Sequence, residues 1–216
     1  EDPLEKVPEQ IHGSKEVVIA KVRWHSQRSE SGEWFRAAKD AYEQFPDEQD
    51  LAELYATSIL SFVLGDGGLV YGRKLDAEET SLCQEACRIL SASWNKFKDP
   101  SNHVRGEPIS TPLNLTLLHR VLGDDDGALA VAEEALVRFP DNEEVWTRAA
   151  AVYSEVGQHA RAFELVEQLP LDSTTVQIRF SAALSLKKWK EVTNLSAQHI
   201  ELFPKQDQMP VRAAGL

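Results

Sequence analysis

The segment that comes nearest to a ligand-binding motif is a glycine-rich stretch in the first third of the chain. Gly67, the four residues after it and Gly72 reproduce the glycine spacing of a phosphate-binding loop, whose backbone N–H groups hold phosphates. That motif then requires Gly-Lys-Ser/Thr, whereas Gly72 is followed by Arg-Lys-Leu, and the stretch follows a helical pattern rather than a strand. We therefore interpret it as an insertion between two helices, with three candidate partner-contact residues: Tyr71, Arg73 and Lys74.

The acidic, thiol and imidazole side chains do not follow the spacing of a metal or catalytic motif. The run from Asp124 to Asp126 lacks the twelve-residue spacing of a calcium loop, so we interpret it as the cap of the helix that follows. Cys83 and Cys87 are four residues apart in a helical pattern, which favours two small core residues. No His-Glu-x-x-His or Gly-x-Ser-x-Gly occurs, although a nucleophile and base from distant positions stay open. We expect no catalytic residue, no metal and no cofactor.

The charge balance restricts the class of partner. The 216 residues include 23 Lys plus Arg and 35 Asp plus Glu, which gives a net charge of −12. Nucleic acids and anionic membranes bind through clustered Lys and Arg, so we expect neither as a partner. The chain shows no secretory signal pattern and only two cysteines, so a cytoplasmic location is expected.

Helix-ending signals recur along the chain. Phe-Pro follows an amphipathic stretch at 45–46, 139–140 and 203–204, and proline disfavours helix at the residue before it. Pro140 and Pro204 are 64 residues apart, which indicates two repeats of about 32 residues. The sequence therefore predicts a series of helical units rather than one irregular domain.

The clearest unit lies between Pro140 and Pro170. Trp146, Ala149, Ala150 and Tyr153 share one helical face, Gly157 breaks the helix, and a second helix follows over 160–166. The spacing resembles the tetratricopeptide repeat (TPR), whose pattern is Trp-x2-Leu-Gly-x2-Tyr, then Ala-x3-Phe, then Pro. Neighbouring stretches repeat parts of this pattern. We predict that the tryptophans at 146 and 189 lie in the core between helices.

The resemblance implies an all-α fold, a right-handed superhelical stack of about five antiparallel helix hairpins. We expect a flexible flank at 1–13, a repeat domain at 14–204 and a flexible tail at 205–216. The expected hairpins cover 14–46, 49–98 with an insertion at 65–76, 111–140, 143–170 and 173–204.

In TPR proteins the first helices of the hairpins line a concave groove that holds a peptide or partner segment. The resemblance places these positions in the groove: Asp50, Glu53, Thr57, Asn114, Leu117, Arg120, Glu144, Thr147, Arg148, Ala151, Gln177 and Ser181. Asn114 and Arg148 come near a clamp for partner C-terminal carboxylates, but the lysine of that clamp is missing. The acids at Asp50 and Glu53 favour a peptide that is basic toward their end of the groove.

The sequence thus predicts a non-catalytic protein-interaction module that acts as a scaffold or adaptor. Because the chain does not begin with methionine, the alternative is a helical sensor or regulatory segment of a larger signalling or defence enzyme. Self-association through the terminal hairpins is a third use that the sequence leaves open.

Overall fold

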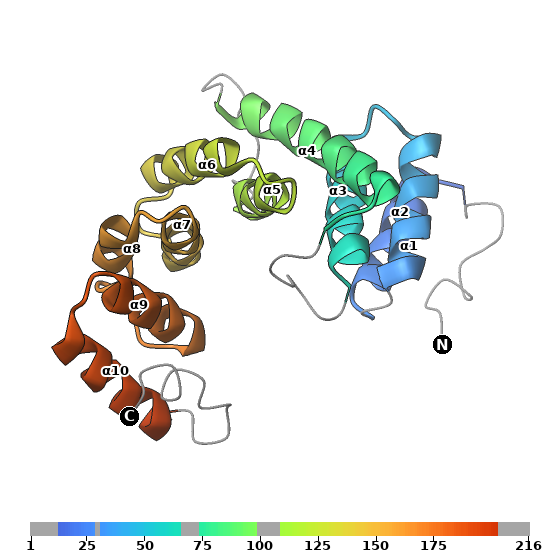
Figure 1. Ribbon diagram of the computed structural model, residues 1–216. Helices are drawn as coiled ribbons and strands as arrows, with labels where there is room; N and C mark the ends of the chain where they lie inside the picture. The colour runs from blue at the N-terminus through green and yellow to red at the C-terminus, as the bar shows by residue number, and fades with distance from the viewer. Residues whose placement is uncertain (1–12, 29–30, 66–73, 99–108, 203–216) are drawn as a thin grey trace. The chain divides into compact units, whose positions relative to one another are not determined.

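The computed structural model describes residues 13–28, 31–65, 74–98 and 109–202, and these residues form helices and connecting turns without a strand (Figure 1). The all-α prediction is confirmed. The helices of these ranges are α1 (Lys15–Ser26), α2 (Ser31–Gln44), α3 (Gln49–Leu64), α4 (Ala77–Lys98), α5 (Ser110–Val121), α6 (Asp125–Arg138), α7 (Glu143–Glu155), α8 (His159–Val166), α9 (Ser173–Ser185) and α10 (Trp189–Leu202). Residues 1–12 of the expected flank at 1–13, and the whole expected tail at 205–216, lie outside the described residues.

The chain divides into two compact units, residues 1–124 and 125–216. In the first unit α1 packs on α2, α2 on α3, α3 on α4 and α4 on α5. In the second unit the same order holds from α6 to α10. The stretch expected as one hairpin over 111–140 crosses this division, so the pairing of α5 with α6 stays a prediction.

The Phe-Pro signals end helices where proline chemistry predicts. Helices α2 and α6 end at Gln44 and Arg138, each two residues before its proline. The third Phe-Pro pair, at 203–204, lies outside the described residues. Proline lacks an N–H and restricts the residue before it, so the helix stops ahead of that pair.

A second kind of ending closes helices α5, α7 and α9. Gly123, Gly157 and Lys187 follow α5, α7 and α9 with φ of 74°, 81° and 57°. In each turn the next residue donates its N–H to the carbonyl five residues back, as Asp124 does to His119 at 2.8 Å. This is the Schellman ending, in which glycine adopts the left-handed conformation without a steric cost. Lysine adopts the same conformation at 187, where it is less favourable.

The second unit has two layers. Figure 1 shows α7 and α9 along one side of the unit, with α6, α8 and α10 along the other. Small buried residues at the contacts, including Ala150 on α7, Ala162 on α8 and Ala182 on α9, let the helices approach closely. Phe163 and Val166 of α8 fill the space between the layers. The first helices of two hairpins therefore share one face, as a TPR-like array requires.

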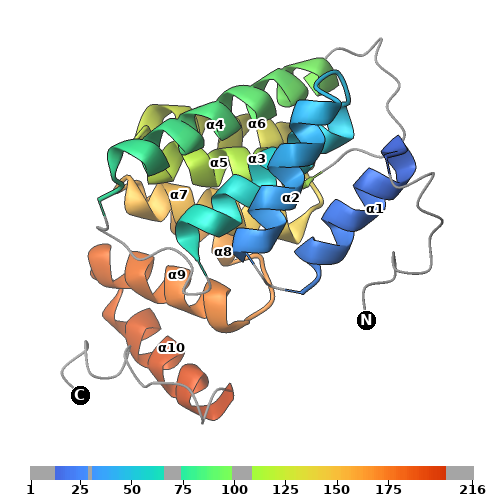
Figure 2. The ribbon, with the colours of Figure 1, turned by 90° about the vertical axis from the view of Figure 1, so that its right-hand side faces the viewer.

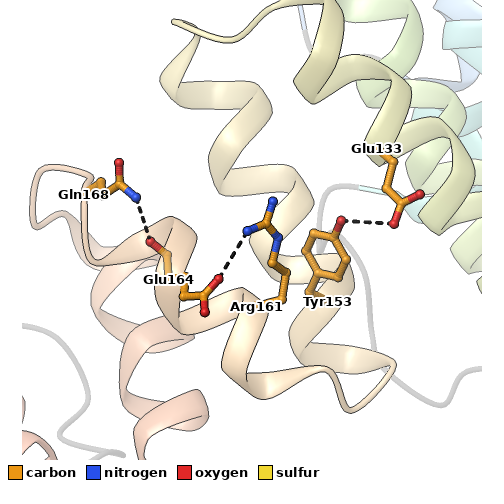
Figure 3. Close-up of polar contacts among 5 residues, drawn as sticks. All are labelled: Glu133, Tyr153, Arg161, Glu164 and Gln168. Carbon is orange, nitrogen blue, oxygen red and sulfur yellow. Dashed lines mark hydrogen bonds and ion pairs between the residues drawn. The ribbon is translucent and has the colours of Figure 1, made fainter.

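Polar contacts also connect α6, α7 and α8 (Figure 3). The Tyr153 hydroxyl of α7 donates to Glu133 Oε1 of α6 at 3.3 Å. On α8, Arg161 lies beside the Tyr153 ring and pairs with Glu164 at 3.2 Å. Burial and the charge of Glu133 raise the pKa of Tyr153, while Arg161 opposes that rise. The buried phenol therefore keeps its proton and acts as a hydrogen-bond donor between two helices.

An aromatic stack joins α2 to α3 in the first unit, where these helices lie side by side (Figure 2). Phe35 of α2 stacks on Phe62 of α3 with ring centroids 4.7 Å apart, and Tyr42 stacks on Tyr55 at 5.2 Å. The Tyr55 hydroxyl donates to Glu85 Oε2 of α4 at 3.4 Å. Burial, assisted by the Glu85 charge, raises the pKa of Tyr55 to about 12.

The Tyr55 environment predicts a distinct alkaline titration. Absorbance at 295 nm is expected to show one phenol ionising near pH 12, and this step should vanish in Tyr55→Phe but persist in Tyr42→Phe. The unfolded chain releases the Tyr55 proton near pH 10, about the ordinary tyrosine value. The native state keeps it to about pH 12, so the free energy of unfolding falls across this window. Complete ionisation of the native protein by pH 11 would contradict the burial of Tyr55.

The two tryptophans expected in the core differ. Trp146 is partly buried against the core of the second unit, and its Nε1 donates to the Pro140 carbonyl at 2.8 Å. Trp189 is 61% exposed at the start of α10, so the core prediction for it is wrong. The turn between α9 and α10 places Lys188, rather than Trp189, over the Phe163 ring at 3.6 Å.

Candidate functional site

The groove positions on α3 and α5 belong to the first unit, and two of them meet. Asn114 Nδ2 of α5 donates to Thr57 Oγ1 of α3 at 3.4 Å. Asp50 at the start of α3 is exposed and pairs with Arg23 of α1 at 3.6 Å. These contacts join successive first helices, so Asp50, Thr57 and Asn114 lie where such helices meet. The other two positions on α5, Leu117 and Arg120, are half-buried.

Glu53 points elsewhere. Its carboxylate accepts hydrogen bonds from Ser93 Oγ of α4 and from Gln49 Nε2, the latter at 3.0 Å. The side chain lines a pocket of about 240 Å³ that also includes Arg88 and Lys96 of α4. Glu53 is therefore held by the second helix of its own hairpin, which the helical periodicity of α3 alone does not reveal.

An acidic pocket in the second unit contains two of the predicted groove positions, Glu144 and Thr147 of α7. The pocket has a volume of about 270 Å³ and is completed by Glu143, the connector between α8 and α9, and the start of α9. Its full lining is Glu143, Glu144, Thr147, Leu169, Pro170, Asp172, Thr174 and Thr175. The sequence reasoning missed the connector residues, because their place beside α7 depends on how the two helices pack.

Local structure fixes the wall of this pocket. Asp172 caps α9: its Oδ1 accepts from the Thr175 N–H at 2.7 Å, and Thr175 Oγ1 accepts from the Asp172 N–H at 2.8 Å. The Thr147 hydroxyl donates to the Glu143 carbonyl at 2.8 Å. Glu143 and Glu144 are exposed, and no hydrogen bond or ion pair of their carboxylates is seen among the described residues. The pocket thus presents two carboxylates beside apolar Leu169 and Pro170.

The remaining predicted positions are dispersed. Arg148 and Ala151 are half-buried on α7, while Gln177 and Ser181 are exposed on α9. Of the candidate loop contacts, Lys74 is exposed, and Tyr71 and Arg73 lie outside the described residues.

A thiol, an imidazole and a carboxylate lie close together in the first unit, where α4 contacts α5. Cys87 Sγ of α4 is 3.6 Å from Nε2 of His119 on α5. The other ring nitrogen, Nδ1, is 2.7 Å from Asp124 Oδ2. The Cys87 contact is the largest cause that raises the pKa of His119, Asp124 raises it further, and burial opposes the rise. Cys83, one turn earlier on α4, is fully buried.

Within the part of the chain that the structure describes, no three His, Cys, Asp or Glu side chains are placed to hold a metal ion.

The described helices include none with the length and apolar character needed to cross a membrane.

Comparison with protein families finds the tetratricopeptide repeat in the middle of the chain. The family match covers residues 113–152, from α5 through most of α7. No curated protein sequence matches the chain.

Solved structures with the same fold are TPR-type helical proteins of low sequence identity. YrrB, a TPR protein with an unusual peptide-binding site, is 11% identical with a TM-score of 0.65, and the match covers 100% of this chain and 99% of YrrB. PilW, a type IV pilus biogenesis factor, is 14% identical with a TM-score of 0.68, over 97% of this chain and 86% of PilW. A chain from the APC/C hetero-tetramer Cut9-Hcn1 is 12% identical with a TM-score of 0.61, over 95% of this chain but 36% of its own length. At these identities the likeness establishes the fold.

Proposed function

Because the chain is a TPR-like helical repeat protein, we propose that it is a non-catalytic protein-interaction module that acts as a scaffold or adaptor. A peptide or partner segment binds along the first helices of the second unit, α7 and α9. The observation that carries this proposal is the acidic pocket between α7 and the start of α9. Support also comes from YrrB, a protein of the same fold that has a peptide-binding site.

The chemistry of the pocket selects the kind of side chain that enters it. Glu143 and Glu144 attract a cation, and Leu169 and Pro170 offer apolar surface to the methylene stem of a lysine or arginine. Asp172 adds negative charge, although its carboxylate is already used in the helix cap. The bound segment therefore carries a basic residue that enters the pocket, with flanking residues along Gln177 and Ser181 of α9.

This proposal places the basic residue of the peptide at Glu143 and Glu144, rather than at Asp50 and Glu53 as the sequence predicted. Asp50 pairs with Arg23, and Glu53 accepts from Ser93, so these acids are already in contact with cationic or donor groups. The carboxylates of Glu143 and Glu144 have no such contact among the described residues, so they are the stronger attraction for a basic side chain.

Charge neutralisation at the pocket tests the proposal. A phage library of random twelve-residue peptides is selected on the wild-type chain, and Kd values of the enriched peptides are measured by fluorescence anisotropy. Peptides with a central Lys or Arg are expected to be enriched. Their affinity should fall about tenfold in the Glu143→Gln/Glu144→Gln variant, equivalent to the loss of about 1.4 kcal/mol.

A control with the same loss of charge separates the pocket from the net charge. The Glu164→Gln/Glu167→Gln variant removes two acids from α8 and its C-terminal end, outside the pocket. Its affinity for the selected peptides should match that of the wild type. Equal weakening in the two double variants, or no enriched peptide, would overturn the proposal.

A further inference from the structure

Cys87, His119 and Asp124 form a relay of three functional side chains that the interaction function does not use. Asp124 Oδ2 lies 2.7 Å from His119 Nδ1, and His119 Nε2 lies 3.6 Å from Cys87 Sγ. A carboxylate accepts hydrogen bonds and does not donate them, so it holds the His119 proton on Nδ1. Nε2 is then left with a lone pair directed to the thiol. The arrangement is that of a nucleophile, its base and the group that orients the base.

The fold explains why these side chains meet. The Schellman ending of α5 bonds the Asp124 N–H to the His119 carbonyl at 2.8 Å, which brings the Asp124 side chain back over the last turn of the helix. The packing of α4 on α5 then places Cys87 against the other edge of the ring. His119 has 17% of its side chain exposed, and Cys87 is only partly buried. The pair is therefore partly open to solvent, while contacts at both ring nitrogens hold the imidazole in place.

We propose that Cys87 is a nucleophilic thiol that is covalently modified by hydroperoxides, with His119 as its base and Asp124 as the residue that positions His119. The Cys87 proton passes to His119 Nε2, and the thiolate attacks the terminal oxygen of the peroxide. The S–O bond forms as the O–O bond breaks, and the leaving alkoxide or hydroxide takes the proton from His119. Cys87 is oxidised by two electrons to the sulfenic acid, and the peroxide is reduced to an alcohol or water.

The raised pKa of His119 agrees with a ring that accepts a proton from its neighbour. Cys83 provides an internal reference, since it lies one turn earlier on the same helix and is fully buried. Thiol reactivity depends on thiolate character and access. Cys87 has a base within reach and partial exposure, whereas Cys83 lacks the exposure.

Site-resolved sulfenic acid trapping tests the proposal on the whole chain. The protein is treated with hydrogen peroxide and dimedone at pH 7, and mass spectrometry with peptide fragmentation assigns the label to Cys83 or Cys87. Cys87 is expected to be labelled at least about tenfold faster than Cys83. His119→Gln should lower the Cys87 rate about fivefold or more, and Asp124→Asn by a smaller factor.

The pH dependence distinguishes a base from a merely structural residue. Above about pH 10 an ordinary cysteine is ionised without help, so the wild-type and His119→Gln rates should converge there. His159→Gln, on α8, should keep the wild-type rate at every pH, and circular dichroism should show native helix content for each variant. Equal labelling of the two cysteines, or a His119→Gln rate that falls equally at pH 7 and pH 10, would overturn the proposal.

Discussion

Replacement of Phe163 by alanine is expected to lower the free energy of unfolding of the second unit by about 3–5 kcal/mol. Phe163 is 4% exposed and belongs to a core cluster with members on every helix from α6 to α10. Its ring also lies under Lys188 Nζ at 3.6 Å and Arg179 Cζ at 5.6 Å. Truncation leaves a cavity and removes both cation–π contacts, so the loss should lie at the upper end of the range.

Urea denaturation followed by circular dichroism measures this loss, and hydrogen exchange locates it. Amide protection should fall in α6 to α10 before it falls in α1 to α5, because repeat proteins are stabilised mainly by contacts between neighbouring elements. Val137→Ala is the matched control, since Val137 of α6 is 83% exposed and should change stability by less than about 0.5 kcal/mol. A Phe163→Ala loss below about 1 kcal/mol would show that the cluster is not the core.

Helix ends were the most predictable part of the fold. Proline after Phe45 and Phe139 acts on its own neighbours alone, so the sequence predicted the ends of α2 and α6 without reference to the rest of the molecule. Gly157 ends α7 for an equally local reason, a left-handed conformation that favours glycine. Local rules fail at Lys187, where the surrounding repeat imposes the same turn on a lysine.

Side-chain environments depend on packing and were harder to predict. The face of a helix can be derived from its periodicity, which placed Glu144 and Thr147 together on one face of α7; both line the pocket. Periodicity does not give the rotation of one helix against the next, which decides that Glu53 turns to Ser93 and that Trp189 is exposed. The same limit explains why the sequence treated Cys87 as a core residue.

The contact of Cys87 with His119 spans 32 positions and carries no signature in the sequence. The contact between His119 and Asp124 could have been predicted locally, because the two residues are five positions apart across the glycine that ends α5. When a helix has His in its last turn and Asp directly after the glycine that ends it, the turn can bring the carboxylate within hydrogen-bond distance of the imidazole. The partner thiol could be found only once α4 was seen to pack on α5.

Leu118→Ala is expected to destabilise the first unit by about 2–5 kcal/mol. Leu118 is fully buried on α5, which packs on α4 and on α3. Loss of this buried side chain leaves a cavity in the core of the first unit that helices of fixed geometry fill only in part. Hydrogen exchange should therefore show the loss of protection in α3, α4 and α5 while α9 and α10 keep theirs.

The neighbouring residue on α5 provides the control for this variant. Leu117 is half-buried, so Leu117→Ala removes a side chain of the same size from a position that already contacts water, and the loss should be clearly smaller. Chemical denaturation of the two variants under the same conditions gives the comparison directly. Equal losses, or equal loss of protection in α4 and α10 for Leu118→Ala, would contradict a first unit whose core is formed by α3, α4 and α5. The two units would then unfold together rather than separately, because in a single cooperative array the loss of one core side chain lowers stability along the whole length.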